Sequence, residues 1–119
     1  MMNLLQLELC AASVEALPLA KTYGFTRIEL CQNLEQGGLT PSAGLILQAL
    51  ELGIETHVLI RPRAGGFHYS QEEMEVIKKE IQHCAQLGVH GVVVGVLQAN
   101  FELDKVQLLA LQELAHNLD

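Results

Sequence analysis

The sequence predicts an α/β fold, the N-terminal half of a (β/α)8 barrel of the TIM type, built from four parallel βα units. Three observations predict this fold. Apolar segments of strand length alternate with longer segments that have helical periodicity. Glycines follow the first three predicted helices and lead into the next strand. Three consecutive strands place aliphatic side chains on one face and polar side chains on the other.

The predicted elements alternate along the whole chain. The strands are expected at residues 4–9, 26–30, 55–60 and 91–97. The helices are expected at residues 13–23, 41–52, 71–87 and 105–118. Strands that alternate with helices indicate a parallel sheet with right-handed crossovers.

Local signals mark the helix ends. Ser70 and Glu73 form a Ser-x-x-Glu capping box at the third helix. Thr40 is expected to cap the second helix, with Pro41 in its first turn. Pro18 lies inside the first predicted helix, and we expect it to kink that helix or shift its start.

The two faces of the strands favour a barrel over an open sheet. A doubly wound sheet carries helices on both faces and needs both to be apolar. A barrel carries helices only outside, so its interior can be polar where a site is built. The sequence also lacks the glycine-rich motifs of dinucleotide-binding and P-loop proteins. A barrel interior is therefore the predicted location of the polar strand face.

The number of units predicts a partial barrel. A complete barrel has eight units in about 250 residues, whereas this chain of 119 residues has four. We expect residues 1–119 to form a single partial barrel domain with open edges at its first and fourth strands. Because open edges favour association, we expect a fragment of a longer protein, a homo-oligomer, or pairing with a missing C-terminal half-barrel.

Composition and charge narrow the classes of partner. The net charge of −7 argues against nucleic acid or an anionic membrane as the main partner. The longest apolar run, residues 92–97, is far too short to span a membrane. No secretion signal is recognisable at the N-terminus. Three cysteines without an export signal fit free thiols in a reducing cytoplasm, where we expect the protein.

Two strands end in the same pattern, an aliphatic residue, glutamate, leucine and cysteine. Alternate residues of a strand share a face, so Glu8 lies with Cys10 and Glu29 with Cys31. If the two strands are parallel neighbours, both thiols meet at the carboxyl edge, where α/β folds bind ligands. Such a pair predicts redox chemistry or a soft metal ion, and Cu(I) needs only two thiolates. The alternative is that these cysteines are buried apolar fillers, as we expect for Cys84.

A polar cluster is predicted on the inner face, formed by Glu8, Glu29, His57 and Arg61. Two interpretations stay open. The cluster can be a structural network in which Arg61 and Arg27 hold the two carboxylates, because buried charges must be paired. It can also line a cavity for a polar or anionic small molecule.

Two loops are candidate anion sites. Gly37 and Gly38 precede a helix N-terminus, where free N–H groups can bind an anion. Arg61 and Arg63 add two guanidinium groups after the third strand, suited to carboxylate or phosphate. The alternatives are a plain tight turn and a salt-bridged loop.

Several segments of this chain closely resemble the CutC family, in the family's order and at its spacing. The matching segments are Arg-Ile-Glu-Leu-Cys at 27–31, Gly-Gly-Leu-Thr-Pro-Ser at 37–42, His-Val-Leu-Ile-Arg-Pro-Arg at 57–63, Phe-His-Tyr-Ser at 67–70 and Gly-Val-Leu at 95–97. The resemblance implies a cytoplasmic (β/α)8 barrel linked to copper homeostasis, with Cu(I) bound by cysteines that match Cys10 and Cys31. It also implies oligomers, commonly dimers.

The chain departs from the family pattern in two places. The family has an acidic residue in the loop at 63–67, where this chain reads Arg-Ala-Gly-Gly-Phe. The sequence also stops where the family's fifth strand is expected to begin.

Two functional hypotheses follow from the residues and the resemblance. The leading one is a CutC-like protein of copper homeostasis that binds Cu(I) through Cys10 and Cys31. The alternative is a barrel enzyme, or its remnant, that acts on a small anionic or phosphorylated metabolite, with Glu8, Glu29 and His57 as acid–base groups. In a third, structural interpretation, the polar interior is only an ion-pair network.

Overall fold

A single four-stranded parallel sheet organises the computed structural model, which describes residues 5–118. The elements are β1 (Glu8–Ala11), α1 (Ala16–Thr22), β2 (Arg27–Leu30), the 3-10 turn η1 (Leu34–Gln36), α2 (Ala43–Glu51), β3 (Glu55–Leu59), α3 (Gln71–Leu87), β4 (Gly91–Val93) and α4 (Lys105–Asn117). The strand order is β1-β2-β3-β4, and every neighbouring pair is parallel. The four predicted βα units are therefore confirmed.

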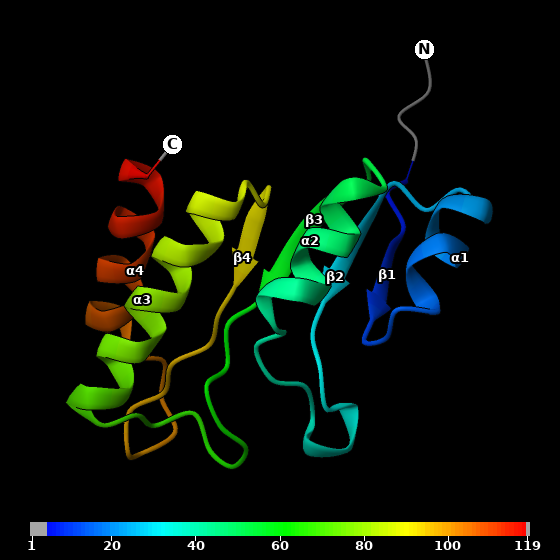
Figure 1. Cartoon of the computed structure of the whole chain (residues 1–119). Coiled ribbons are helices and arrows are strands. Elements are labelled where there is room, and N and C mark those ends of the chain that lie inside the picture. Colours follow the sequence, from blue (N-terminus) through cyan, green and yellow to red (C-terminus); the bar gives the residue numbers. More distant parts are fainter. Residues whose placement is uncertain (1–4, 119) are drawn as a thin grey trace.

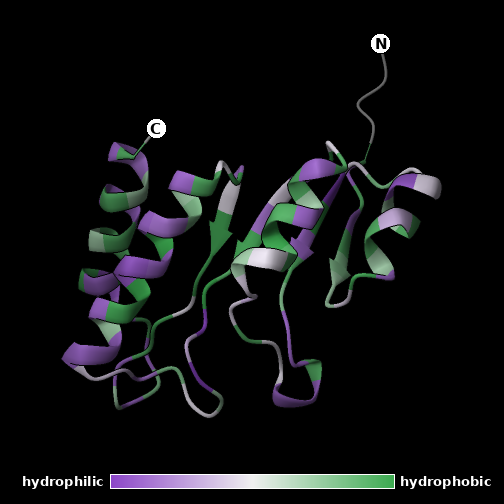
Figure 2. Cartoon of the chain, viewed as in Figure 1, coloured by the Kyte–Doolittle hydropathy of each residue, from purple (hydrophilic) through white to green (hydrophobic). Residues whose placement is uncertain are grey.

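The helices lie on one side of the curved sheet (Figure 1). Ile28, Leu30 and Val58 point to this side and are fully buried, together with helix residues such as Leu17 and Ile77. Along α3, hydrophilic and hydrophobic bands alternate (Figure 2), because its buried residues recur every three or four positions. The sheet thus has one aliphatic face under helices and one polar face, as the strand pattern predicts.

β2 and β3 match the predicted bounds to within one residue, whereas β1 and β4 differ by more. β1 begins at Glu8 because its partner β2 begins only at Arg27, after the left-handed turn at Gly24. Residues 5–7 precede β1, and residue 4 of the predicted strand lies outside the described residues. β4 ends at Val93 instead of continuing to Leu97, which donates its N–H to the Phe67 carbonyl in the preceding loop.

Two helices begin later than predicted. α1 begins at Ala16, which leaves Pro18 in the first turn, where its missing N–H costs nothing. The expected shift of the helix start at Pro18 is therefore confirmed. α2 is capped by Ser42 rather than by Thr40, because the Ser42 hydroxyl accepts a hydrogen bond from the Leu45 N–H. The predicted bounds of α3 and its Ser-x-x-Glu capping box are confirmed.

The loops after β2, β3 and β4 gather at the carboxyl edge of the sheet (Figure 1). Thr40 links the loops after β2 and β3. Its N–H donates to the Arg61 carbonyl, and its hydroxyl accepts a hydrogen bond from the Arg61 N–H. These bonds hold the loops in position over the strand ends. Within residues 5–118, no helix is both long and apolar enough to cross a membrane.

Candidate functional site

The thiols of Cys10 and Cys31 lie side by side at the carboxyl edge of the sheet. β1 and β2 are parallel neighbours in a register that pairs Cys10 with Glu29. Cys31 follows β2 and donates its N–H to the Ala11 carbonyl at 3.0 Å, so it continues the same ladder. The two Sγ atoms are 4.0 Å apart. The predicted meeting of the two thiols is therefore confirmed.

The distance between the sulfurs suits a bridging ion better than a direct bond. A disulfide needs about 2.05 Å between its sulfurs. With ~2.3 Å as a typical metal–thiolate bond, a linear sulfur–ion–sulfur arrangement needs roughly 4.6 Å. The observed 4.0 Å is close to that span, and Cys10 is exposed. Within residues 5–118, no group of three or more His, Cys, Asp or Glu side chains is arranged to hold a metal.

Cys31 is protected from solvent by the glycine loop after β2. Only 2% of Cys31 is exposed, and burial, followed by the nearby Cys10 and Glu29, raises its pKa to about 12. A Cβ atom on Gly38 would lie 3.1 Å from the Leu59 side chain and 3.6 Å from the Cys31 sulfur, and Gly38 has a φ of +96°. The glycine therefore gives the loop both the backbone conformation and the space to pack over the thiol.

Ion pairs connect the polar side chains on the inner face. The Arg27 Nε donates to Glu8 at 2.6 Å, and its Nη1 lies 3.6 Å from Glu55. The Nε2 of His57 lies 2.7 Å from the same Glu55 carboxylate. The structure thus brings Glu8 and His57 of the predicted cluster into one network. Glu55 was absent from that prediction although its position on the same strand face was recognisable.

Glu29 and Glu55 have pKa values shifted in opposite directions. Burial, followed by the charge of Glu8, raises the pKa of Glu29. The hydrogen bond with His57 is the largest cause of the lowered pKa of Glu55. The contribution of Glu29 to stability is present below its ordinary pKa and is lost as pH rises through the raised value. The contribution of Glu55 to stability is present above the ordinary pKa of a glutamate and is lost as pH falls through the lowered pKa.

Arg61 does not neutralise Glu8 and Glu29 as predicted. Its Nη1 donates to the carbonyls of Gln36 and Gly38, at 2.6 and 2.9 Å, and its Nη2 donates to the Gly65 carbonyl at 2.9 Å. The reason is its position two residues beyond the end of β3, from which the side chain reaches across the loops. Arg27, rather than Arg61, pairs with the carboxylate of Glu8.

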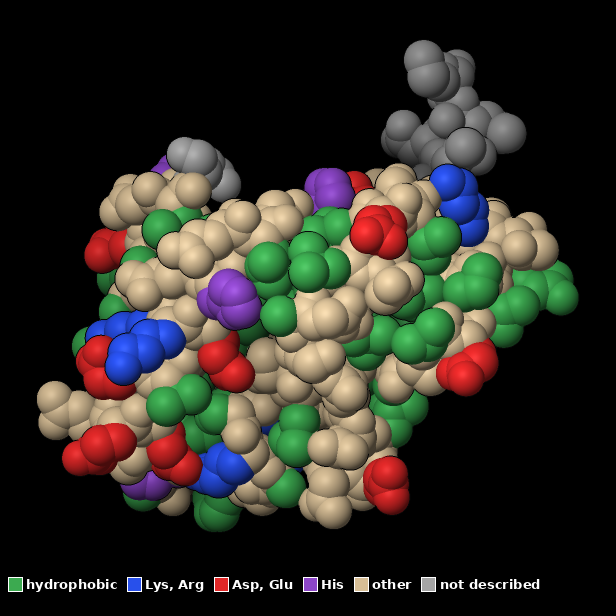
Figure 3. Space-filling model, in the orientation of Figure 1, with side chains coloured by type: hydrophobic (Ala, Val, Ile, Leu, Met, Phe, Trp, Pro, Cys, Tyr) green, Lys and Arg blue, Asp and Glu red, His purple; other side chains and the backbone are tan. Residues whose placement is uncertain are grey.

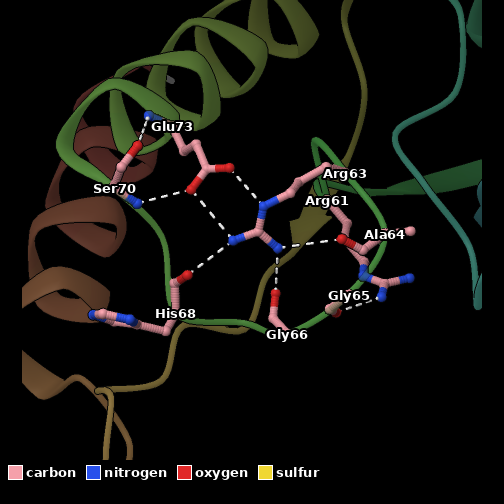
Figure 4. Close-up of polar contacts among 8 residues, drawn as sticks. All are labelled: Arg61, Arg63, Ala64, Gly65, Gly66, His68, Ser70 and Glu73. Atoms are coloured by element: carbon pink, nitrogen blue, oxygen red, sulfur yellow. Dashed lines mark hydrogen bonds and ion pairs between the residues drawn. The ribbon is translucent and has the colours of Figure 1, made fainter.

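The N–H donors of Arg63 all have partners in its own loop or at the start of α3 (Figure 4). Its Nε and Nη2 donate to the Glu73 carboxylate. Its remaining N–H groups donate to the carbonyls of Ala64, Gly66 and His68. All five donors of the guanidinium therefore have partners, and the predicted anion contact by Arg63 is replaced by a structural role.

The glycine loop also has no free donors at the two predicted positions. The N–H of Gly37 donates to the Leu34 carbonyl at 2.8 Å, and that of Gly38 to the Asn33 carbonyl at 3.0 Å. The expectation that Gly37 and Gly38 bind an anion through their N–H groups is therefore wrong. These donors close the 3-10 turn, and the loop directs carbonyls, not N–H groups, at Arg61.

Two buried polar atoms near the mouth were not predicted. Arg61 Nε and the Tyr69 hydroxyl have no hydrogen-bond partner among the described residues. Each residue is only 8% exposed. Burial raises the pKa of Tyr69, and the charges of Arg63 and Arg61 act against that shift. Within residues 5–118, Arg61 also has no carboxylate partner. Its charge is met by neutral carbonyls and by the Phe67 ring, whose centre lies 5.0 Å from the Arg61 Cζ.

Residues 5–119 match the model of the CutC family. A CutC family protein from Vibrio vulnificus (strain YJ016) is 43% identical over 114 residues, which are 95% of this chain and 46% of that protein. One from Xylella fastidiosa (strain Temecula1) is 44% identical over 113 residues, which are 94% of this chain and 42% of that protein. The chain thus spans slightly less than half the length of these relatives.

A solved structure has the same arrangement of strands and helices. The crystal structure of a CutC protein from Streptococcus agalactiae, described as a candidate copper homeostasis protein, matches with a TM-score of 0.84 at 33% sequence identity. The match covers 92% of this chain and 54% of that chain. Together with the four parallel strands, it gives the chain the fold of half a (β/α)8 barrel.

The contact between His57 and Gly91 predicts a stability effect. Gly91 is the register partner of His57 on β4, and a Cβ atom on Gly91 would lie 2.6 Å from the His57 Nδ1. Gly91→Ala should therefore lower the free energy of unfolding by about 1–3 kcal/mol, the usual cost of overpacking. Urea titration measures the free energy of unfolding of each variant. Gly66→Ala is the matched control, since a Cβ there meets nothing within 4 Å. An unchanged stability in Gly91→Ala, or an equal loss in a His57→Ala background, would contradict the contact.

The burial of the three thiols predicts an order of alkylation. Cys10 is exposed, whereas Cys31 and Cys84 are buried, and burial raises the pKa of Cys84 to about 11. Because the thiolate is the reactive form, iodoacetamide at neutral pH should modify Cys10 first. Mass spectrometry of tryptic peptides gives the three rates, with the urea-unfolded chain as the control in which they converge. Equal rates in the folded chain would contradict this packing.

Proposed function

The chain belongs to the CutC family, and on this premise we propose that it binds one Cu(I) ion between the thiolates of Cys10 and Cys31. The proposal includes a role in copper homeostasis in the cytoplasm, where thiols stay reduced. The observation that carries it is the 4.0 Å separation of the two sulfurs at the carboxyl edge. Both residues lie in this chain, so the proposal does not depend on the rest of the longer relatives.

The donor set favours Cu(I) over other metal ions. Soft thiolates select Cu(I), zinc and iron–sulfur clusters, but zinc and clusters usually require four protein ligands. Within residues 5–118, no third His, Cys, Asp or Glu forms a group with the two thiols, and this donor set matches an ion that accepts two ligands. The exposed Cys10 offers the first contact, and the buried Cys31 completes the pair.

The surroundings of the thiols set the pH dependence of uptake. Copper has to displace the proton of Cys31, whose pKa is raised to about 12, because the metal binds the thiolate. Glu29, the register partner of Cys10, supplies negative charge that disfavours a free thiolate but attracts a cation. The bound ion therefore gains from the same acidic face that keeps Cys31 protonated.

The copper proposal predicts a stoichiometry and two essential residues. The reduced chain should bind one Cu(I) in an anaerobic titration against a chromogenic Cu(I) chelator. Cys10→Ser and Cys31→Ser should each abolish uptake, because one thiolate cannot form the pair. Cys84→Ser is the matched control and should bind normally, since Cys84 lies in the core under α3.

Zn(II) provides a second test in the same experiment. Zn(II) should not be retained after gel filtration, because its usual four ligands are not supplied. Undiminished Cu(I) uptake by the Cys10→Ser/Cys31→Ser double variant would reject the proposal.

The second candidate function is binding, or turnover, of a small anionic metabolite at the barrel mouth. The specific observation that favours it is the buried guanidinium of Arg61, which lacks a carboxylate partner within residues 5–118 and leaves its Nε unpaired. A buried charge of this kind is stabilised by a counter-ion. Glu29, with its raised pKa, and His57 would then be the acid–base groups on the inner face.

The anion candidate predicts stabilisation by inorganic phosphate. Sodium phosphate should raise the melting temperature more than sodium chloride at equal ionic strength, because a ligand that binds only the folded state stabilises it. Arg61→Lys and Tyr69→Phe should each reduce that increase. Arg27→Lys is the matched control and should leave it unchanged, since Arg27 lies on the ion-pair network of the inner face. An equal rise in melting temperature with both salts in the wild-type chain would reject this candidate function.

A further inference from the structure

We propose that two copies of this chain associate to close one eight-stranded barrel, with β1 of each copy added to β4 of the other. This inference goes beyond the copper proposal and does not depend on it. Four features of the structure support the proposed association. They are two open sheet edges, an apolar groove at one edge, a row of exposed leucines at the other, and a polar face that closure would enclose.

The sheet ends at two edges that can accept each other. β1 and β4 are the terminal strands of a wholly parallel sheet, and each pairs on one side only. A free parallel edge presents unpaired N–H and C=O groups to a further parallel strand. Joining β4 of one copy to β1 of the next, twice, gives a ring. Four strands from each copy make the eight of a closed (β/α)8 barrel.

An apolar groove lies at the β4 edge. It has a volume of 630 Å³ and runs between α3, β4 and the C-terminal half of α4. Its apolar lining includes Ile81, Val89, Val92, Val94, Leu108 and Leu111. In a (β/α)8 barrel, the strand that follows the fourth helix lies beside the fourth strand, under that helix. The groove is therefore where the outward side chains of a fifth strand would pack.

A row of leucines at the β1 edge offers those side chains. Leu5, Leu7 and Leu9 alternate, so in an extended chain they share one face. Leu9 packs against the core under the helices, whereas Leu7 is 61% and Leu5 93% exposed. In an extended conformation these two side chains would continue the helix-side face of β1 beyond the point where β2 pairs with it. A second copy of the chain can insert them into the groove beside β4.

A second copy fits better than any single added strand because the chain carries both halves of the contact. In a twofold dimer, each copy gives its leucine row and receives its partner's, so one association event forms two seams. The helix-covered side stays outside, where charged side chains gather over α3 (Figure 3), including the Lys78–Glu75 pair. The polar inner faces of both copies become the barrel interior.

The experiment is to measure the mass of the reduced full chain in solution. Sedimentation equilibrium and light scattering should give twice the chain mass. Leu7→Glu should lower this to a single chain mass, because it introduces a charge at the proposed seam. Leu34→Glu is the matched control: Leu34 is 55% exposed but lies in η1, away from both edges, so this variant should stay dimeric. Circular dichroism should show both variants folded.

Each result bears on the proposal. A dimer that Leu7→Glu dissociates and Leu34→Glu does not supports closure through the two edges. A folded wild-type monomer would overturn it, as would a dimer insensitive to Leu7→Glu or an open polymer, in which the seams do not close. Copper uptake is measured separately on the same samples, so failure of closure and failure of the copper proposal are distinguishable.

Discussion

The parallel register between β1 and β2 is the constraint on which the candidate site depends. It pairs Cys10 with Glu29 and sets Cys31 one inner-face position further along, so that two sulfurs from distant parts of the sequence come within 4.0 Å. A slip of one residue would turn every side chain of β1 to the opposite face. That slip would bury Glu8 under the helices and remove Cys10 from Cys31. The hydrophobic pattern therefore fixes the chemistry as well as the fold.

Arg61 and Arg63 are close in sequence and have different consequences at the barrel mouth. Arg63 has every donor satisfied, two of them by Glu73 at the N-terminus of α3, so it ties the loop to that helix. Arg61 links the loops after β2 and β3 through neutral carbonyls, and within residues 5–118 no carboxylate pairs with its buried charge. Gly37 is part of this link, because a Cβ there would lie 3.0 Å from the Arg61 Nη1. Arg63 is thus a structural link to α3, whereas Arg61 keeps an Nε without a partner among the described residues.

Sequence patterns predict well where local chemistry determines the outcome. The bounds of α3 follow from the capping box at Ser70 and from the glycine after Leu87, because caps act over a few residues. The meeting of Cys10 and Cys31 follows from alternation within strands and from neighbouring βα units. The partners of Arg61 were mispredicted because they depend on where β3 ends and how a loop folds over it. The unpaired Tyr69 hydroxyl was likewise invisible, since no local pattern reports which polar atoms lack partners.

The open β1 edge links the metal-binding and association proposals through Cys10. This residue is exposed, and within residues 5–118 no strand pairs with the outer edge of β1. On the inner face, the row that begins at Cys10 continues through Glu29 and His57 and ends at Gly91 on β4. The His57 ring occupies the inner-face space over Gly91, since a Cβ atom there would lie 2.6 Å from the His57 Nδ1. Closure would place Cys10 and Cys31 at the mouth of a complete barrel. The same strand can therefore contribute its outer edge to assembly and its thiol to metal binding.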